Sequence, residues 1–82
     1  MTEVKAMTAA DINAYVGRRI RGRRMALGMS QAAFAASLGM SESWVALVEG
    51  GRRGMPVARL VAVAVAVGVD PGDLLPAVVP GD

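Results

Sequence analysis

Apolar residues recur every three or four positions in the first third of the chain, the spacing of one face of an α-helix. The stripe consists of Ile12, Val16, Ile20 and Leu27. Arg24 falls within the same stripe. Thr8 followed three residues later by Asp11 is typical of a capping box, and Gly28 is a stop signal just beyond the stripe. The pattern therefore predicts a first helix that begins after Thr8 and ends before Gly28.

Two short helices are predicted next. Ser30 is a suitable N-cap for a helix over 31–38, and Gly39 stands where a left-handed residue would end it. The arrangement then repeats, with Ser41 as the N-cap of a helix over about 42–49. Two glycines follow as a stop signal.

The stretch 57–67 is apolar on both faces, because valines alternate with alanines, so periodicity does not distinguish a strand from a helix. Pro56 and Gly68 bracket it as helix punctuation, and a lone strand among helices would have no pairing partner. Asp70 then opens a one-turn helix through Leu75. The sequence thus predicts an all-α bundle of five helices.

Composition excludes several classes of protein. A chain of 82 residues forms one domain, and with no Cys and no His it lacks the commonest metal ligands, general base and thiol nucleophile. No paired carboxylates or cofactor motif replaces them, so we expect neither an enzyme nor a cofactor or metal. The longest uncharged apolar run, 60–69, has ten residues where a membrane span needs about 20, so we expect a cytoplasmic protein.

The positive charge is clustered. The net charge is only +2, yet five arginines lie within 18–24 and a further pair is formed by Arg52 and Arg53. Acidic residues gather near the C-terminus, so the molecule is electrostatically two-sided. Such clusters favour an anionic partner, although a solvated helix face is the simpler alternative.

The segment 31–49 has the pattern of a helix-turn-helix. Two short helices cross closely only when the residue at the crossing is small and the turn tolerates a positive φ, and Ala35 and Gly39 meet these needs. The chain here resembles the phage-repressor-like (XRE-type, lambda-repressor-like) DNA-binding domains. The motif that carries the resemblance comprises Ser30-Gln31, Phe34-Ala35, Leu38-Gly39-Met40-Ser41, Trp44-Val45 and Val48-Glu49-Gly50-Gly51-Arg52-Arg53.

We expect three regions: a flexible N-terminal segment 1–7, a DNA-binding domain 8–75 and a C-terminal tail 76–82. The resemblance also implies an ion pair between Arg24 in the first helix and Glu49 at the end of the recognition helix.

The resemblance implies that helix 42–49 enters the major groove of double-stranded DNA. The expected base contacts are Ser41, Glu42, Ser43, Trp44 and Leu47. The expected phosphate contacts are Gln31, Arg52, Arg53, Arg19 and Arg23. The recognition helix has no Arg, Lys, Asn or Gln, the types that pair with purines, so base readout would be thin. Trp44 either meets thymine methyls or packs against the preceding helix.

The C-terminal half carries an excess of apolar residues. By analogy with the family, helix 57–67 would bury Val57, Leu60, Val61, Ala64 and Val67. Its outward positions would then be uncharged: Ala58, Ala62, Val65 and Ala66. With the tail residues added, we expect a self-association surface comprising Val65, Leu74, Leu75 and Val78.

The leading interpretation is a homodimeric DNA-binding transcription regulator, and a repressor in particular. Two alternatives use the same fold. One is the antitoxin of a toxin–antitoxin pair, with the apolar surface bound to a toxin. The other is a protein-interaction module that has lost DNA binding.

Overall fold

A computed structural model of the protein describes residues 7–77. Within these residues the chain forms four α-helices, α1 (Ala9–Ala26), α2 (Gln31–Leu38), α3 (Glu42–Glu49) and α4 (Val57–Val67), followed by a 3-10 turn, η1 (Pro71–Leu74). The all-helical prediction is confirmed for this part of the chain. Residues 1–6 of the predicted flexible segment, and Val78 of the predicted association surface, lie outside the described residues.

The predicted fifth helix is corrected to a single 3-10 turn. Asp70 and Asp73 cap each other, as the Asp70 N–H donates to Asp73 Oδ2 at 3.2 Å and the Asp73 N–H to Asp70 O at 2.9 Å. This reciprocal cap starts a helical turn, but the chain is already extended at Leu75. Because Pro76 follows immediately and disfavours a helical conformation at the residue before it, the turn does not extend into an α-helix.

Hydroxyl side chains begin the first three helices. Thr8 Oγ1 accepts a hydrogen bond from the Asp11 N–H at 3.0 Å, within the predicted capping box. Ser30 Oγ accepts from the Ala33 N–H at 3.0 Å, and Ser41 Oγ from the Trp44 N–H at 3.1 Å. Each cap satisfies a backbone donor that has no partner within its own helix.

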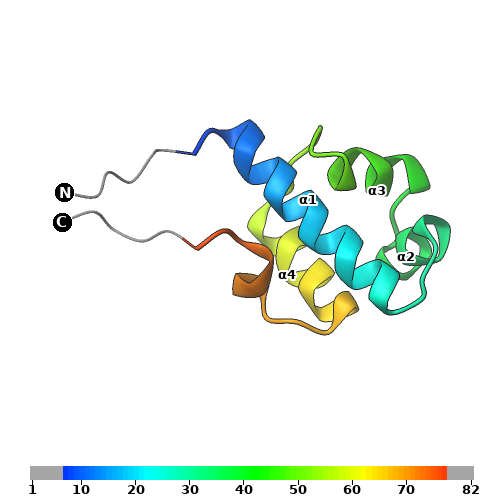
Figure 1. Cartoon of the computed structure of the whole chain (residues 1–82). Helices are drawn as coiled ribbons and strands as arrows, with labels where there is room; N and C mark the ends of the chain where they lie inside the picture. The colour runs from blue at the N-terminus through cyan, green and yellow to red at the C-terminus, as the bar shows by residue number, and fades with distance from the viewer. Residues whose placement is uncertain (1–6, 78–82) are drawn as a thin grey trace, which may run out of the picture.

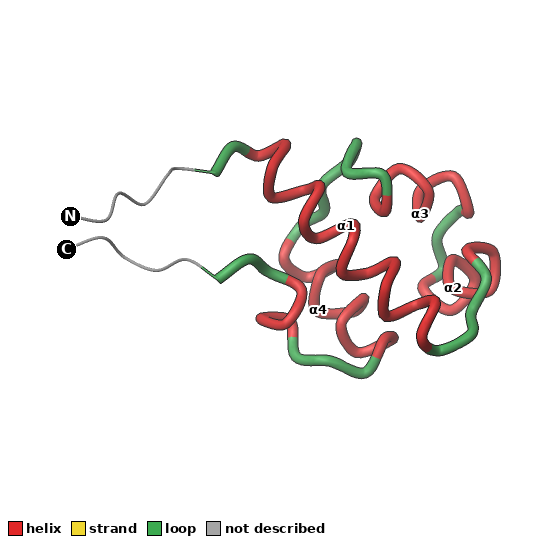
Figure 2. Tube along the Cα trace, viewed as in Figure 1, coloured by secondary structure: helices red, strands yellow, loops and turns green. Residues whose placement is uncertain are grey.

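The helix α1 packs against α3, α4 and η1, and α2 packs against α3 and α4. Figure 1 shows α1 crossing the molecule diagonally, with α2 and α3 towards one side and α4 and the C-terminal turn towards the other. Figure 2 shows the loops that join the helices, the longest of which connects α3 to α4. The core lies where these elements meet, and its largest fully buried side chains are Phe34, Ile20, Leu74, Val45, Val63 and Val67.

The inward face of α4 differs from the prediction. The helix buries Leu60, Val63, Ala64 and Val67. Val57 and Val61, which the family analogy would bury, are instead 76% and 43% exposed. Because Val and Ala are both apolar, packing against α1, α2 and η1 selects the buried face. No helix within residues 7–77 is both long enough and apolar enough to span a bilayer.

Candidate nucleic-acid interface

The helices α2 and α3 form the predicted helix-turn-helix. Gly39 ends α2 with φ at 66°, a left-handed conformation that costs glycine little, and the Met40 N–H donates to Ala35 O at 2.9 Å. Ala35 is fully buried in α2, which packs on α3. The turn therefore directs the chain straight from α2 into a second helix pressed against the first.

The α3 helix is divided lengthwise into two faces. Its inward face buries Trp44, Val45, Val48 and Glu49. Its outward face exposes Glu42, Ser43, Ala46 and Leu47, which lie three and four residues apart and thus side by side on the helix. We call these four residues the reading face. None of them belongs to the buried core or to the partly buried apolar residues packed against it, so they are available to a partner.

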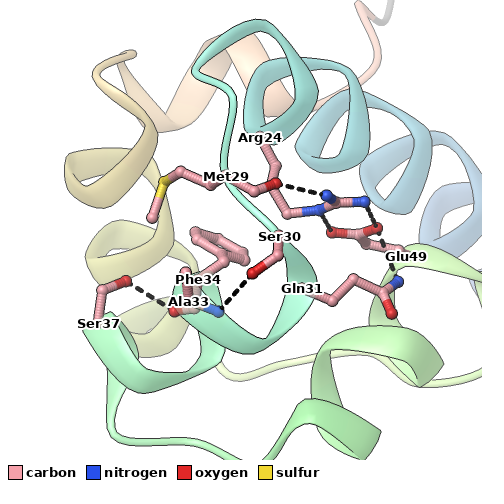
Figure 3. Close-up of polar contacts among 8 residues, drawn as sticks. All are labelled: Arg24, Met29, Ser30, Gln31, Ala33, Phe34, Ser37 and Glu49. Atoms are coloured by element: carbon pink, nitrogen blue, oxygen red, sulfur yellow. Dashed lines mark hydrogen bonds and ion pairs between the residues drawn. The ribbon is translucent and has the colours of Figure 1, made fainter.

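A buried ion pair fixes the far end of α3 (Figure 3). Arg24 Nε donates to Glu49 Oε2 at 2.7 Å, and Arg24 Nη2 to Glu49 Oε1 at 2.9 Å. Arg24 Nη1 also donates to Met29 O at 2.7 Å, so one guanidinium joins α1, the α1–α2 loop and α3. This is the pair that the resemblance implied. The hydrogen bond to Glu49 raises the pKa of Arg24 above its ordinary value against the opposing effect of burial, so the guanidinium stays charged.

Gln31 belongs to the same polar network. Its Nε2 donates to Glu49 Oε1 at 3.2 Å, so the first residue of α2 braces the last residue of α3 (Figure 3). The side chain is half-buried, with part of it accessible at the start of α2. The structure thus gives Gln31 a bracing contact to α3, and its phosphate contact remains a prediction.

Sequence analysis missed the contact that brings α1 close to α3. A Cβ added at Gly17 would overlap the carbonyl oxygen of Val48 and lie 2.7 Å from that of Glu49. The end of α3 therefore rests directly on the α1 backbone. The signal available in the sequence was a glycine inside a helix, where its intrinsic cost needs a packing reason.

Arg19 and Arg23 are hydrogen-bonded within the domain, and their phosphate contacts stay a prediction. Arg19 Nε donates to Asp73 O at 3.1 Å, and Arg23 Nη2 donates to Val67 O at 3.1 Å. A four-residue step places both on the flank of α1 that meets α4 and η1. Each of these guanidinium groups donates to a carbonyl group at the end of a neighbouring element and does not extend towards α3.

The sequence allowed Trp44 either to face a partner or to pack inward, and the structure places it inward. It is 7% exposed and forms part of the core with Phe34, Ala35 and the buried valines. Its burial follows from its place on the α3 helix, one residue before Val45 and four before Val48. We therefore leave Trp44 out of the reading face. Ala46, which sequence analysis overlooked, takes part in it instead.

Arg52 and Arg53 are exposed in the loop that follows α3. The Arg52 N–H donates to Leu47 O at 2.9 Å, which ties the start of this loop to the last turn of α3. The two guanidinium groups are thus carried by backbone that is fixed to the recognition helix.

These features together are those of a helix-turn-helix domain. The α3 helix exposes one face, the loop after it carries two arginines, and a buried ion pair holds the helix in place. The family model described as "Helix-turn-helix domain" matches residues 16–78, and the chain belongs to this family. Its type is the lambda-repressor-like (XRE) one that the sequence resembles. A comparison with curated protein sequences finds no match.

Solved structures share the fold. The restriction-modification controller protein C.AhdI from Aeromonas hydrophila is 32% identical, with a TM-score of 0.72, and the match covers 77% of this chain and 96% of that one. A hypothetical transcription factor, NHTF from Neisseria, is 26% identical with a TM-score of 0.76, covering 93% and 85%. Hydroxypropylphosphonic acid epoxidase from S. wedmorenis is 29% identical with a TM-score of 0.75 over 79% of this chain, but only 35% of the epoxidase is covered.

Proposed function

We propose that the protein is a sequence-specific DNA-binding transcription regulator that inserts α3 into the major groove. The observation that carries the proposal is the division of α3, whose four outward residues have no role in the core while its inward residues hold it rigidly. A helix about 10–12 Å across fits the major groove, where base edges are accessible. Membership of the helix-turn-helix family and the likeness to C.AhdI and NHTF support the same function.

The proposed base contacts are Ser41, Glu42, Ser43 and Leu47, together with Ala46. The proposed phosphate contacts are Gln31, Arg52 and Arg53. Because Arg52 is anchored at the end of α3, a phosphate bound there would set the depth and register of the helix in the groove. We further propose that the protein acts as a repressor, since occupation of a promoter blocks polymerase without any additional chemistry.

We propose that the regulator is a homodimer that associates through α4. Val65 is 75% exposed and lines a groove of about 490 Å³ between α2 and α4, together with Met29, Ser37, Leu38, Ala62 and Ala66. The groove has no charged residue, so a second copy of this basic protein could approach without repulsion. Two recognition helices about 34 Å apart would read a two-fold operator.

Two residues of the predicted association surface need revision. Leu74 is fully buried and is removed from it, because it anchors η1 in the core. Leu75 is 41% exposed but lines a different hollow, with Ile12 and Leu60, so it does not adjoin the groove. The proposed surface is therefore centred on Val65 and the α2–α4 groove.

Fluorescence anisotropy with a labelled pool of randomised duplexes tests DNA binding without knowledge of the operator. The affinity should fall with salt, with a log–log slope of about 0.9 for each phosphate neutralised. Replacing Arg52 and Arg53 by alanine should reduce the slope by about two units for each protomer and weaken binding to all duplexes alike. Absence of binding at low salt would overturn the proposed function.

Arg19→Ala is the matched control for lost positive charge. Its guanidinium contacts Asp73 O near η1, so its removal should leave the salt slope unchanged. A loss of slope equal to that of Arg52→Ala would show that the basic residues act through net charge alone, and not through the α3 loop.

The apolar groove favours a second candidate function. A groove lined by Leu38, Ala62 and Val65 could hold an apolar helix of another protein, such as the toxin of a toxin–antitoxin pair. The same titration, together with copurification, separates these functions from the regulator. A protein-interaction module would show no salt-dependent binding to duplexes, whereas an antitoxin that also binds DNA would show it and would copurify with its partner.

A further inference from the structure

The reading face of α3 has an unusual chemistry for a helix in the major groove. Glu42 offers only acceptors at neutral pH, Ser43 offers a small hydroxyl, and Ala46 and Leu47 offer methyl groups. Leu47 is 38% exposed, which is a substantial apolar surface at the centre of a polar site. The face carries no guanidinium and no amide, so it cannot form the bidentate pairs that read guanine or adenine.

The base edges of the major groove respond differently to such a face. A carboxylate is attracted by the amino group at cytosine N4 and repelled by the acceptors of guanine and by thymine O4. The amino group of adenine is less suitable, because it lies between two acceptors, adenine N7 and thymine O4. Apolar side chains favour the C5-methyl group of thymine. Cytosine offers an amino group to Glu42, and thymine offers a methyl group to Leu47, but neither base offers both groups.

One base does satisfy both groups. In 5-methylcytosine the N4 amino group and the C5-methyl group occupy adjacent ring positions with no acceptor between them. On α3, Glu42 and Ala46 are four residues apart, which places the Ala46 methyl beside the carboxylate, and Ser43 and Leu47 form the neighbouring pair on the same exposed face.

We propose that the reading face recognises C5-methyl groups next to an amino donor, and that 5-methylcytosine is the base that it binds best. The inference rests on the proposed DNA-binding function. Unmethylated sites are bound through adjacent cytosine and thymine, and methylation of the contacted cytosine strengthens binding. The protein thereby distinguishes methylated from unmethylated copies of the same operator.

The test begins with a duplex enriched by the wild-type protein from a randomised pool of unmodified DNA. The duplex is synthesised in three forms: unmodified, with deoxyuridine for thymidine, and with 5-methyldeoxycytidine for deoxycytidine. Burial of one methyl group changes affinity by about fourfold. We expect the deoxyuridine duplex to bind about fourfold more weakly for each contacted methyl, and the methylated duplex to bind about fourfold more tightly.

Two variants assign the effect to α3. Leu47→Ser should bring both affinity ratios close to one, whereas Met25→Ser, at a more exposed apolar residue on α1, should leave them unchanged. Glu42→Gln should shift selection from cytosine towards adenine, because an amide pairs with adenine N6 and N7.

The outcomes separate this inference from the proposed function. Wild-type ratios within twofold of one, with the salt dependence intact, would overturn methyl recognition and leave DNA binding standing. Ratios that persist in Leu47→Ser would also overturn it, because the methyl groups would then be read elsewhere. Absence of salt-dependent binding to every duplex would overturn both.

Discussion

Individual residues fix the position of α3 on the rest of the domain. Gly17 lets the end of α3 rest on the backbone of α1, and Arg24 holds that end through Glu49 and the loop carbonyl of Met29. These two contacts differ in kind. The first is possible because Gly17 has no side chain, and the second is a network of charged hydrogen bonds. Each makes a separate prediction about stability.

Gly17→Ala should destabilise the protein by about 1–3 kcal/mol, because the new methyl would collide with backbone oxygens that cannot rotate away. Gly22→Ala is the matched control in the same helix. A Cβ there meets nothing within 4 Å, so the change should stabilise the helix by about 0.5–1 kcal/mol. Denaturation in urea measures both. Equal effects of the two substitutions would contradict the close approach of α1 and α3.

Arg24→Met should cost about 3–5 kcal/mol, because it strands the carboxylate of Glu49 in the core. The double variant Arg24→Met with Glu49→Leu should recover most of this stability, since no buried charge remains. Thermal unfolding of the two variants and the wild type forms the comparison. An Arg24→Met protein as stable as wild type would mean that the pair is not buried in solution.

At the scale of elements, local signals predicted where helices begin, and packing decided which face they bury. The serine caps and the glycine at position 39 identified α2 and α3 correctly, because caps act within one turn. The inward face of α4 was predicted wrongly, with Val63 buried in place of Val57. A run of Val and Ala offers two apolar faces of similar size, and the choice between them depends on α1 and α2.

The candidate site, like the helices, was predicted from the sequence only in part. The resemblance identified Glu42, Ser43 and Leu47, which lie on the exposed face of α3, but it left open whether Trp44 faces a partner or the core. The phosphate contacts of Arg19 and Arg23 stay a prediction. An arginine-rich helix did not reveal that both side chains donate to carbonyl groups of neighbouring elements.

Ser41→Ala should destabilise the protein by about 1 kcal/mol, because the Trp44 N–H then loses its acceptor at the start of α3. Ser43→Ala is the control, two residues along on the exposed face, where no capping bond is made. Chemical denaturation in the absence of DNA separates the two serines. If Ser43→Ala proves as destabilising as Ser41→Ala, the α3 helix begins elsewhere.

At the scale of the whole molecule, charged and apolar surfaces are kept apart. The arginines of the α3 loop adjoin the reading face, whereas the groove between α2 and α4 is lined by uncharged residues alone. This separation allows one surface to bind a polyanion while the other binds a copy of the protein.

Val65→Glu should weaken self-association at least tenfold, because a carboxylate would be buried in the interface without a partner. Met25→Glu places the same charge on an exposed apolar residue of α1 and should leave association unchanged. Sedimentation velocity over a range of protein concentrations measures both. A wild-type protein that stays monomeric throughout would contradict the proposed dimer.

The lengthwise division of α3 also bears on how such a protein diverges. Substitutions at the four outward positions alter neither the volume of the core nor the Arg24–Glu49 network, so they meet little resistance from the fold. A duplicated copy of the gene could therefore acquire a different operator through a few changes on one side of a single helix. Under the proposed function, stability and target choice rest on separate sets of residues, and selection can act on the second set without first repairing the first.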